Sequence, residues 1–408
     1  MKKIAFIISL LTLSFVQLSA QISMWGGQVE NSPEINPDCS VTFRYYAPKA
    51  VTVQLRGDFS PKTEMDTPFG KFEAAPYIDM KEGPDGVWSY TTEPLSPEFY
   101  SYLFVVDGRP IIDPSNIYMT RDIGVYANCF IISKEKGDKG DLYSVNDVPH
   151  GTVSKVWYDS PTLKMTRRMT IYTPPGYNPR GKKSYPVMYL CHGGGNDEDA
   201  WQIQGRACQI IDNLIASGKI VPMIVVMPNG NAVQEAAPGE SDKGLVQPDM
   251  SESGAEGVAT IQEAFPDVVR YVDSNYLTIK NKKGRAMCGL SMGGYQTFYT
   301  SMLNPEMFGY LGLFSPGPLI DWDSPVPAFD QFVANTETVS GLKTVFSKKP
   351  YLYWVGIGTE DPHYSDIVGL RKYLDSCNYP YTYFETSGAH EWCVWREHLT
   401  QFAQLIFK

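Results

Sequence analysis

Short apolar and alternating runs dominate residues 25–133. Their length and their content of β-branched and aromatic residues are typical of strands: CSVTFRYYA, AVTVQLRGDF, GVWSYTTEPL, FYSYLFVVDGR and VYANCFIIS. Turn residues such as Pro-Asp-Gly and Asp-Gly separate the runs, and no stretch shows a helical period of useful length. This pattern predicts a β-sandwich domain of about 100 residues.

The pattern changes after residues 134–151, a charged and glycine-containing stretch that is predicted to be a linker. Over residues 152–408, strand-like runs such as YPVMYLC and YLYWVGIG alternate with longer amphipathic stretches such as VATIQEAFPDVVRYVDSN. This alternation predicts an α/β domain, with a mostly parallel sheet covered by helices on both faces.

The first twenty residues are predicted to be a secretory signal peptide. Two lysines precede an apolar run from Ile4 to Val16, and the small residues Ser19-Ala20 follow it. This run is shorter than the ~20 residues that a membrane-spanning helix needs, and no later stretch is long and apolar enough. We therefore expect a secreted protein whose mature chain begins near Gln21, in the periplasm or outside the cell.

The formal net charge of the chain is -10 at pH 7, and loss of the two lysines in the signal peptide would make it -12 (-10 minus 2). An acidic surface disfavours nucleic acid and anionic lipid as partners. Aromatic residues make up 13% of the chain. That share suits a protein that handles sugars or phenolic rings, although composition does not show such a function.

The chain has seven cysteines, too few and too scattered for a disulfide scaffold. Cys39 with Cys129, or Cys377 with Cys393, could pair in an oxidising compartment, and the sequence does not decide the connectivity. No C-x-x-C motif and no histidine pair at metal-ligand spacing is present. We therefore expect no metal site.

The stretch RAMCGLSMGGYQTFY contains a G-x-S-x-G pattern with Ser291 at its centre. The pattern alone is short enough to occur by chance. Here, however, a strand-like run ends directly before Ser291 and a helix-like run follows it, which is the context that a nucleophile elbow requires. We predict that Ser291 is a nucleophile.

A serine that attacks a carbonyl group needs backbone N–H donors for the developing oxyanion. Met292, the residue after the serine, is expected to supply one of them. Gly193 and Gly194 are candidates for the other, within YLCHGGGNDEDAW after an earlier strand. The alternative is that the HGGG motif only forms a flexible loop. The position of this motif ahead of G-x-S-x-G disfavours that alternative.

A serine nucleophile also needs a base, and the expected order along the chain is Ser, acid, His. Two of the five histidines precede the serine, one stands two residues from the candidate acid and one lies in the last amphipathic stretch: His150, His192, His363 and His398. His390 follows a strand-like run and a small-residue turn, directly before the last helix. We predict that His390 is the base.

The acid should follow the strand-like run YLYWVGIG, and Glu360-Asp361 stands there. We favour Asp361, with Glu360 as the alternative. Asp366 and Asp375 fall in the next amphipathic stretch and are interpreted as solvated charges. The acid would hold the imidazole in the correct tautomer and stabilise its cation.

These motifs resemble those of the esterase D-like α/β-hydrolases of carbohydrate esterase family 1, the feruloyl and acetylxylan esterases. The resemblance covers about residues 150–408, through HGGGNDEDAW, IVVMPNG, CGLSMGGYQ, GIGTEDPHYSD and SGAHEWCVWREHL. It implies an α/β-hydrolase fold and a nucleophile, an acid, a base and three oxyanion residues: Ser291, Asp361, His390, Met292, Gly193 and Gly194.

The first part of the chain resembles the early-set, immunoglobulin-like sandwich of the CBM48 type, through VTFRYYAPKAVTVQLRGDF, GVWSYTTEPL and YSYLFVVDGRPIIDPSN. This resemblance implies a domain that either binds glycan or only packs against the catalytic domain. Trp88 and Tyr102 could stack on a sugar or lie in the core, and we favour the core.

Residues 230–257 are polar and glycine-rich and join a strand to a helix. A connection of this length is usually functional or disordered. We expect it to border an acyl pocket together with Trp201 and Tyr295, and the alternative is an ordered surface loop remote from substrate.

The sequence as a whole predicts a secreted serine esterase that needs no cofactor. It would release hydroxycinnamoyl groups such as ferulate from plant cell-wall polysaccharide such as arabinoxylan, through an acyl-enzyme. Alternatives are an acetylxylan esterase, a siderophore esterase and a non-catalytic glycan-binding protein. Enterochelin esterases also place a β-sandwich before an esterase D-like domain, but the signal peptide and the acidic charge weigh against that alternative. The Ser–Asp–His set weighs against a binding protein.

Overall fold

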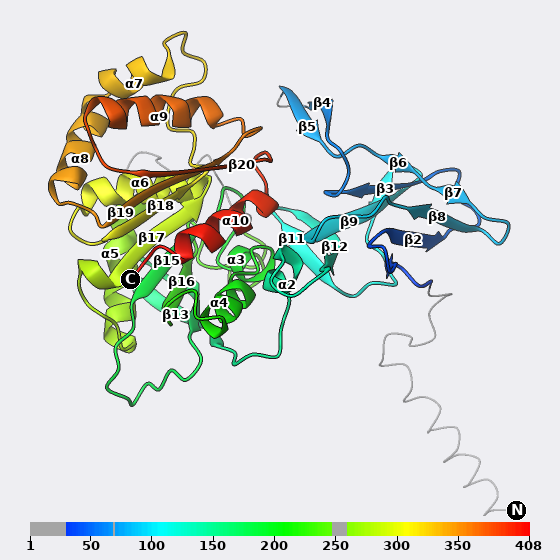
Figure 1. The fold of residues 1–408 in the computed structure, drawn as a ribbon, viewed down its shortest axis with the longest axis horizontal. Coiled ribbons are helices and arrows are strands. Elements are labelled where there is room, and N and C mark those ends of the chain that lie inside the picture. Colours follow the sequence, from blue (N-terminus) through cyan, green and yellow to red (C-terminus); the bar gives the residue numbers. More distant parts are fainter. Residues whose placement is uncertain (1–29, 68–69, 247–258) are drawn as a thin grey trace, which may run out of the picture. The chain divides into compact units, whose positions relative to one another are not determined.

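The computed structural model describes residues 30–67, 70–246 and 259–408 (Figure 1). The predicted signal peptide lies outside these residues, as do residues 247–257 of the long predicted loop. Among the described helices, none combines the length and the apolar composition that crossing a bilayer requires.

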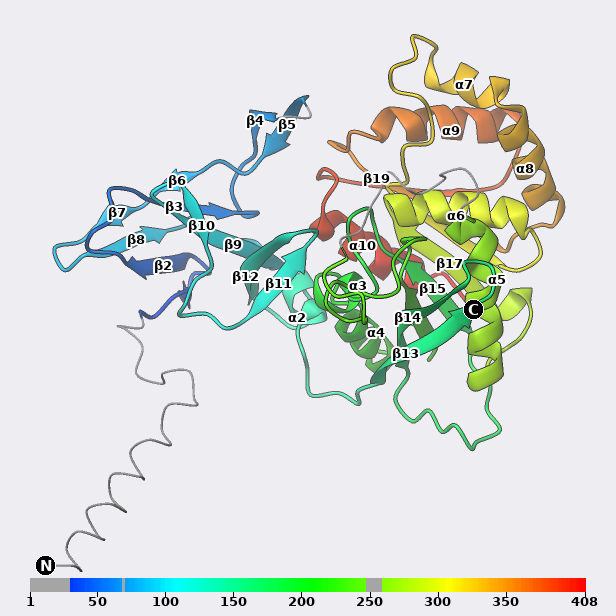
Figure 2. The same cartoon turned by 180° about the vertical axis from the view of Figure 1, so that it is seen from behind.

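An eight-stranded sheet forms the centre of the C-terminal part of the chain, in the order β13-β14-β16-β15-β17-β18-β19-β20 (Figures 1 and 2). The strands are β13 (Thr152–Ser160), β14 (Met165–Thr173), β15 (Val187–Cys191), β16 (Ile224–Pro228), β17 (Arg285–Leu290), β18 (Tyr310–Phe314), β19 (Leu352–Gly358) and β20 (Thr382–Thr386). The β13–β14 and β14–β16 pairs are antiparallel, and the other pairs are parallel. The predicted α/β fold is confirmed.

Helices cover both faces of this sheet. They are α2 (Lys139–Tyr143), α3 (Ala200–Ile203), α4 (Ala207–Ala216), α5 (Ile261–Asn275), the short 3-10 helix η2 (Lys282–Gly284), α6 (Met292–Leu303), α7 (Ala328–Ala334), α8 (Thr336–Ser347), α9 (Tyr364–Ser376) and α10 (Trp392–Ala403). Helices α5, α6, α8 and α9 contribute to one apolar core, whereas α3, α4 and α10 contribute to the other.

Apolar runs such as YPVMYLC form central strands that are buried on both faces. Along β15, Val187, Tyr189 and Cys191 belong to one core, and Met188 and Leu190 belong to the other. Side chains alternate between the faces of a strand, so a run without polar residues can fill both cores at once.

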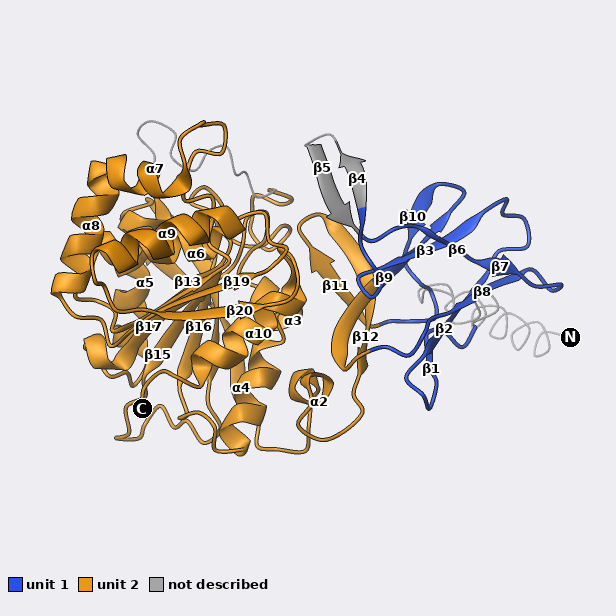
Figure 3. Ribbon diagram, turned by 45° about the horizontal axis from the view of Figure 1, so that its top comes forward, with its two compact units in different colours: residues 1–95, 102–117 blue, residues 96–101, 118–408 orange. Residues whose placement is uncertain are grey.

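The described residues form two compact units (Figure 3). The first contains the described residues up to Leu95 together with Tyr102–Ile117, and the second contains Ser96–Ser101 together with those from Tyr118 onward. The second unit thus includes β11 (Met119–Asp122) and β12 (Val125–Ile132), which form an antiparallel hairpin. The sequence had placed residues 96–101 and 118–133 in the sandwich domain. Strand-like alternation identifies these residues as strands but does not show which unit they pack with.

The first unit is a β-sandwich. One sheet has the order β1-β2-β8-β7, and in the other β9 pairs with β3 and β10, and β3 pairs with β6. A separate hairpin joins β4 and β5. The strands are β1 (Glu34–Ile35), β2 (Val41–Tyr46), β3 (Val53–Gly57), β4 (Thr63–Thr67), β5 (Gly70–Ala74), β6 (Ile78–Asp79), β7 (Lys81–Glu82), β8 (Val87–Thr91), β9 (Glu98–Val106, of which residues 102–106 belong to this unit) and β10 (Arg109–Ile111).

Aromatic side chains join the two sheets of this sandwich. The ring of Phe43 lies 4.7 Å from that of Tyr102, and the ring of Tyr45 lies 5.0 Å from that of Phe104. Trp88 and Tyr102, the candidates for sugar stacking, are 8% and 1% exposed. Both side chains therefore lie in the core, as we favoured from the sequence.

Residues 134–151, predicted to be a linker, are folded into the second unit. They contain α2, which begins after Asp138, and the carboxylate of Asp138 accepts hydrogen bonds from backbone N–H groups of the segment. The side-chain amide of Asn213 donates to two carbonyl oxygens of the segment, at 2.8 and 3.0 Å, and Tyr143 is buried. The charged residues that suggested a linker include the residue that caps this helix.

A buried ion pair within the second unit joins the start of β9 to α10. Glu98 Oε1 accepts from Nε and Nη2 of Arg396 at 3.1 and 2.9 Å, and the Arg396 Nη1 donates to the carbonyl of Gln204 at 2.8 Å. Arg396 is only 2% exposed. Because unpairing a buried cation is costly, we expect Glu98→Ala to lower the free energy of unfolding by about 3–5 kcal/mol in urea titrations.

The exposed pair Lys348–Glu306 is the matched control, since its Nζ–Oε1 distance is 2.6 Å but both side chains are exposed. Glu306→Ala should cost less than about 1 kcal/mol. Equal losses in the two variants would contradict a special role for the buried pair.

Candidate active site

Ser291 stands on a sharp turn between β17 and α6. Its φ of 51° and ψ of -117° lie in a region that residues with a side chain rarely occupy. The Ser291 N–H donates to the carbonyl of Phe314 at 2.9 Å, and the Ser291 carbonyl accepts from the N–H of Tyr295 at 2.9 Å. This strand–turn–helix arrangement is the one that presents a serine hydroxyl above a sheet.

Two glycines allow the turn to lie directly against the end of β15. A Cβ atom on Gly289 would be 2.7 Å from the carbonyl oxygen of Cys191, and one on Gly293 would be 2.5 Å from the same atom. No side chain can occupy either position without moving the backbone. The G-x-S-x-G spacing is therefore a packing requirement of this turn.

Asp361 and His390 form a hydrogen-bonded pair. Asp361 follows β19 and His390 follows β20, and the Asp361 Oδ2 lies 2.9 Å from Nδ1 of His390. The Asp361 side chain is fully buried, and Oδ1 accepts from the N–H of His363 at 2.9 Å. Burial by itself would raise the pKa of Asp361, but the hydrogen bond and charge of His390 and the His363 N–H hold it below the usual value. A carboxylate held in this way keeps the His390 proton on Nδ1 and leaves Nε2 for another partner.

Glu360, the alternative acid, points elsewhere. Glu360 is exposed, and its carboxylate accepts hydrogen bonds from the hydroxyl of Thr359 at 2.7 Å and from the backbone N–H of Gly388. Both residues follow the end of β19 in a turn, in which the Asp361 N–H donates to the carbonyl of Gly358 at 3.2 Å, and only one of the two carboxylates faces His390. In the structure that residue is Asp361.

The loop after β15 lies beside the serine. A Cβ atom on Gly193 would be 3.4 Å from Cβ of Ser291 and 2.4 Å from Cδ1 of Leu290. Met292 is the first residue of α6, and N–H groups of the first turn have no acceptor within their own helix. The structure thus brings Gly193 and Met292 close to Ser291, with Gly194 next along the loop.

His192 connects this loop to the loop after β16, a role that the sequence did not indicate. The Nδ1 of His192 lies 2.8 Å from the carbonyl oxygen of Gly193, and Nε2 accepts from the N–H of Gly230 at 2.7 Å. Burial lowers the pKa of His192, which keeps the ring neutral with its proton on Nδ1. The side-chain amide of Gln296 donates to the Gly230 carbonyl at 2.8 Å and ties both loops to α6.

Aromatic rings surround His390. The ring of Trp395 lies 4.9 Å from it and the ring of His363 lies 5.0 Å from it. His363 in turn packs at 4.6 Å against Trp322, which is 51% exposed and donates its indole N–H to Asp366 at 2.9 Å. Trp322 is an exposed aromatic close to the histidine pair, and nothing in its sequence context separated it from other loop residues.

The β11–β12 hairpin forms part of the surroundings of the loop after β15. A Cβ atom on Gly195 would be 3.0 Å from Cγ2 of Ile123, and the Asn196 amide donates to Asp122 at 3.1 Å. Ile123 is 56% exposed. This contact between segments far apart in the sequence was also not predicted.

Trp201, predicted to contact the substrate, lies instead in the core. It is 1% exposed, and its indole N–H donates to the carbonyl of Cys191 at 2.8 Å. A side chain buried to this extent supports the end of β15 and has no surface left for a ligand. Tyr295 is half-buried, and its ring lies 4.5 Å from that of Tyr299.

Neither disulfide suggested by the sequence is formed, since Cys39 and Cys377 are free thiols. In the part of the chain that the structure describes, no group of three His, Cys, Asp or Glu side chains is placed to hold a metal ion.

His398 lies beneath the site, in the core. It is fully buried among Trp354, Phe314 and Phe384, with ring centroids 5.4 to 6.0 Å away. Burial lowers the pKa of His398 to about 3, below its unfolded value of about 6.5. The unfolded chain therefore binds the extra proton first, and stability is lost as the pH falls from about 6.5 towards 3.

We expect His398 to contribute about 2 kcal/mol to the loss of stability between pH 7 and pH 5. Urea unfolding of the wild type and of His398→Leu at both pH values measures this contribution. The variant should lose correspondingly less stability on acidification. The same pH dependence in both proteins would contradict the prediction.

Residues 160–405 match the family model described as Esterase. An endo-1,4-beta-xylanase/feruloyl esterase of Xylanibacter ruminicola is 32% identical over 345 residues, which is 81% of this chain. The chain spans only 41% of the length of that relative.

Two solved structures share the fold. A CE1 ferulic acid esterase from Anaeromyces mucronatus in complex with ferulic acid has a TM-score of 0.51 at 22% identity, covering 68% of this chain and 98% of the other. An enterobactin esterase from Shigella flexneri has a TM-score of 0.60 at 16% identity, covering 90% of this chain and 92% of the other. At these identities the likenesses show the fold alone.

Proposed function

Because the chain belongs to the Esterase family, we propose that it is a secreted serine esterase that removes hydroxycinnamoyl groups, such as ferulate, from a plant cell-wall polysaccharide such as arabinoxylan. The observation that carries the chemistry is the position of Ser291 on its strained turn at the edge of the sheet where His390 and Asp361 are paired. It is an esterase related to the feruloyl esterases of xylan-degrading enzymes.

In the proposed mechanism, the Ser291 hydroxyl attacks the ester carbonyl carbon while His390 takes its proton. Asp361 holds the imidazole through Nδ1 and stabilises the imidazolium that forms. The backbone N–H groups of Met292 and of Gly193 or Gly194 stabilise the oxyanion. His390 then returns the proton to the sugar oxygen, which leaves, and a water molecule hydrolyses the acyl-enzyme by the same route. No step uses a cofactor.

The choice of substrate rests on the relative of Xylanibacter ruminicola, whose name joins xylanase and feruloyl esterase activities. The acidic net charge of -10 agrees with a neutral polysaccharide substrate better than with an anionic one. Secretion rests on the sequence of residues 1–20. The N-terminal sandwich is proposed to be of the CBM48 type, on the strength of its sequence.

Parallel assays on methyl ferulate, acetylated xylan and a catecholate lactone test the proposal, with Ser291→Ala as the blank for each substrate. We expect the highest kcat/KM on methyl ferulate. Preferential release of acetate would reassign the enzyme to acetylxylan, and preferential cleavage of the lactone would reassign it to a siderophore. No hydrolysis of any ester, by a folded protein that binds xylan, would indicate a glycan-binding protein.

A further inference from the structure

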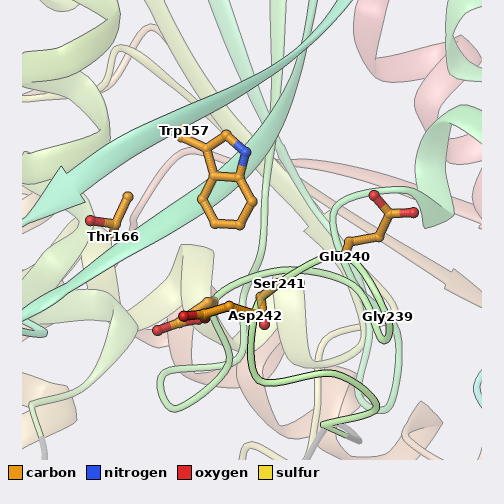
Figure 4. Close-up of a pocket in the computed structure, with 7 residues that line it drawn as sticks. Trp157, Thr166, Gly239, Glu240, Ser241 and Asp242 are labelled. Atoms are coloured by element: carbon orange, nitrogen blue, oxygen red, sulfur yellow. The ribbon is translucent and has the colours of Figure 1, made fainter.

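An open cavity of about 640 Å³ lies away from the catalytic residues, between the β13–β14 ribbon and the loop after β16. This volume is within the range of small-molecule and cofactor sites. The side chains that line it are Trp157, Thr166, Glu235, Glu240, Ser241 and Asp242. Figure 4 shows the indole of Trp157 on one side of the cavity and Ser241 and Asp242 on the loop opposite it.

Trp157 is unusually exposed for a tryptophan in the middle of a strand, at 43%. It stands opposite Arg168 in the β13–β14 ladder. An exposed indole face in a polar cavity suits a ligand with one apolar face and many polar edges. The C–H face of a sugar ring has this character, since it packs against the electron-rich face of an aromatic ring while its hydroxyl groups point outward.

Two of the three carboxylates that line the cavity are paired with cations of the protein, and one of these cations, Arg168, is shared with Glu198 and Asp199. Glu235 Oε1 lies 2.7 Å from Nζ of Lys243, and Glu240 Oε2 lies 2.5 Å from Nη1 of Arg168. The carboxylates thus outnumber the cations, which disfavours an anionic ligand. Carboxylate oxygens and the Ser241 hydroxyl remain good acceptors for hydroxyl groups, which favours a neutral, hydroxyl-rich ligand.

The loop that forms one wall is held by buried polar contacts. The side chain of Glu198 is fully buried, and it accepts from Nε of Arg168 at 2.6 Å, from the Asn229 amide at 2.9 Å and from the N–H of Ala237 at 2.9 Å. The backbone N–H of Arg168 also donates to the carbonyl of Glu235 at 2.7 Å. The cavity is thus preformed, so a ligand does not have to order the loop on binding.

The cavity opens at the same edge of the sheet as the catalytic residues. Met169 pairs with Pro228, the last residue of β16, so Arg168 and Trp157 lie at the carboxyl end of that strand. Four strand spacings separate β13 from β17, which ends at Ser291. At 4.7–4.9 Å per spacing the distance is ~20 Å, within the reach of one extended polymer chain.

We propose that this cavity is a subsite for a neutral polysaccharide chain, which stacks on Trp157 while an ester further along the same chain reaches Ser291. The choice of arabinoxylan as the probe rests on the proposed function. The subsite itself would increase activity on polymer without changing the chemistry at the serine.

The test compares Trp157→Ala with Trp157→Phe and with Tyr351→Ala, a control directly before β19 whose exposed fraction is 59%. Trp157→Ala should lower kcat/KM on feruloylated arabinoxylan by about tenfold, the scale of one lost aromatic anchor. It should leave kcat/KM on methyl ferulate within about twofold. Trp157→Phe should restore most of the polymer activity, and Tyr351→Ala should behave as the wild type.

A binding measurement separates this proposal from the proposed function. In gels that contain de-esterified arabinoxylan, Ser291→Ala should be retarded, and Ser291→Ala with Trp157→Ala should be retarded clearly less. Asp242→Asn, an exposed change that cannot disturb the core, should weaken retardation by a few fold. If esterase activity is absent but retardation depends on Trp157, the subsite stands and the proposed function fails. Equal retardation with and without Trp157, or an equal loss on methyl ferulate and polymer, overturns the subsite.

Discussion

Replacing Ser291 with alanine is expected to lower kcat on methyl ferulate by on the order of 10^4 to 10^6, because members of a catalytic triad act as a unit. The base and the acid would remain paired, but no group would be left to form the acyl-enzyme. The alanine side chain meets the same backbone strain at φ 51° as serine does, so we expect an unchanged fold. Initial rates at saturating ester, with active-site titration of the wild type, measure the loss.

Far-UV circular dichroism and the melting temperature of Ser291→Ala serve as the control for folding. A well-folded Ser291→Ala protein that retains wild-type activity would remove the assignment of the nucleophile and, with it, the proposed function. Loss of activity together with loss of fold would instead require a second variant, and Ser291→Cys keeps the shape of the side chain for that purpose.

Asp361→Asn is expected to lower kcat by roughly 10^4 near neutral pH. An asparagine at this position can donate to Nδ1 of His390, and it then favours the imidazole tautomer that carries its proton on Nε2, where it cannot accept the serine proton. The pKa of Asp361 is held low by His390 despite burial, so the wild-type carboxylate stays charged as the pH falls below neutral. The loss should therefore persist across the acidic range in which the wild type is active.

Glu360→Gln is the matched control, since it changes the neighbouring carboxylate in the same way. Glutamine keeps an oxygen that can accept from Thr359 and from the N–H of Gly388, so the turn before His390 is retained. We expect less than a tenfold loss of kcat. A larger loss for Glu360→Gln than for Asp361→Asn would mean that the acid is Glu360.

The sequence was sufficient to predict the α/β fold and the relation of Asp361 to His390, because both follow from local patterns. An apolar run without polar residues indicates a strand buried on both faces, and a residue directly after such a run lies at the carboxyl edge of the sheet. The close packing at Gly289 and Gly293 requires glycine at both positions, which explains why the G-x-S-x-G motif can be recognised from the sequence alone.

The contacts that the sequence did not predict join segments far apart in the chain. His192 was set aside because it precedes the serine, yet it bonds to Gly193 and Gly230. The structural role of His192 depends on which loops contact each other in the fold, and the spacing of motifs along the sequence does not give that information. The prediction that residues 134–151 form a linker was wrong for a related reason. A charged, glycine-containing linker and a capped helix with a buried tyrosine can have the same composition.

Trp201 shows the opposite error. It follows the HGGG loop, where an aromatic residue could contact an acyl group, but it is buried behind the loop, with its indole bonded to Cys191. Sequence position places the Cα atom near the site and does not decide the side to which the side chain points. The exposure of Trp157 and Trp322 was not predicted either, since the exposed fraction of a side chain depends on which other segments cover it.

The backbone conformation of Ser291 opposes the stability of the protein. A residue with a side chain in this region costs about 1–3 kcal/mol, whereas glycine adopts it without a steric penalty. Selection for thermal robustness alone would therefore favour glycine at position 291. A relative with glycine at this position would be a candidate for a stable, inactive descendant that has kept the fold and any glycan binding. The serine persists only while hydrolysis itself is under selection.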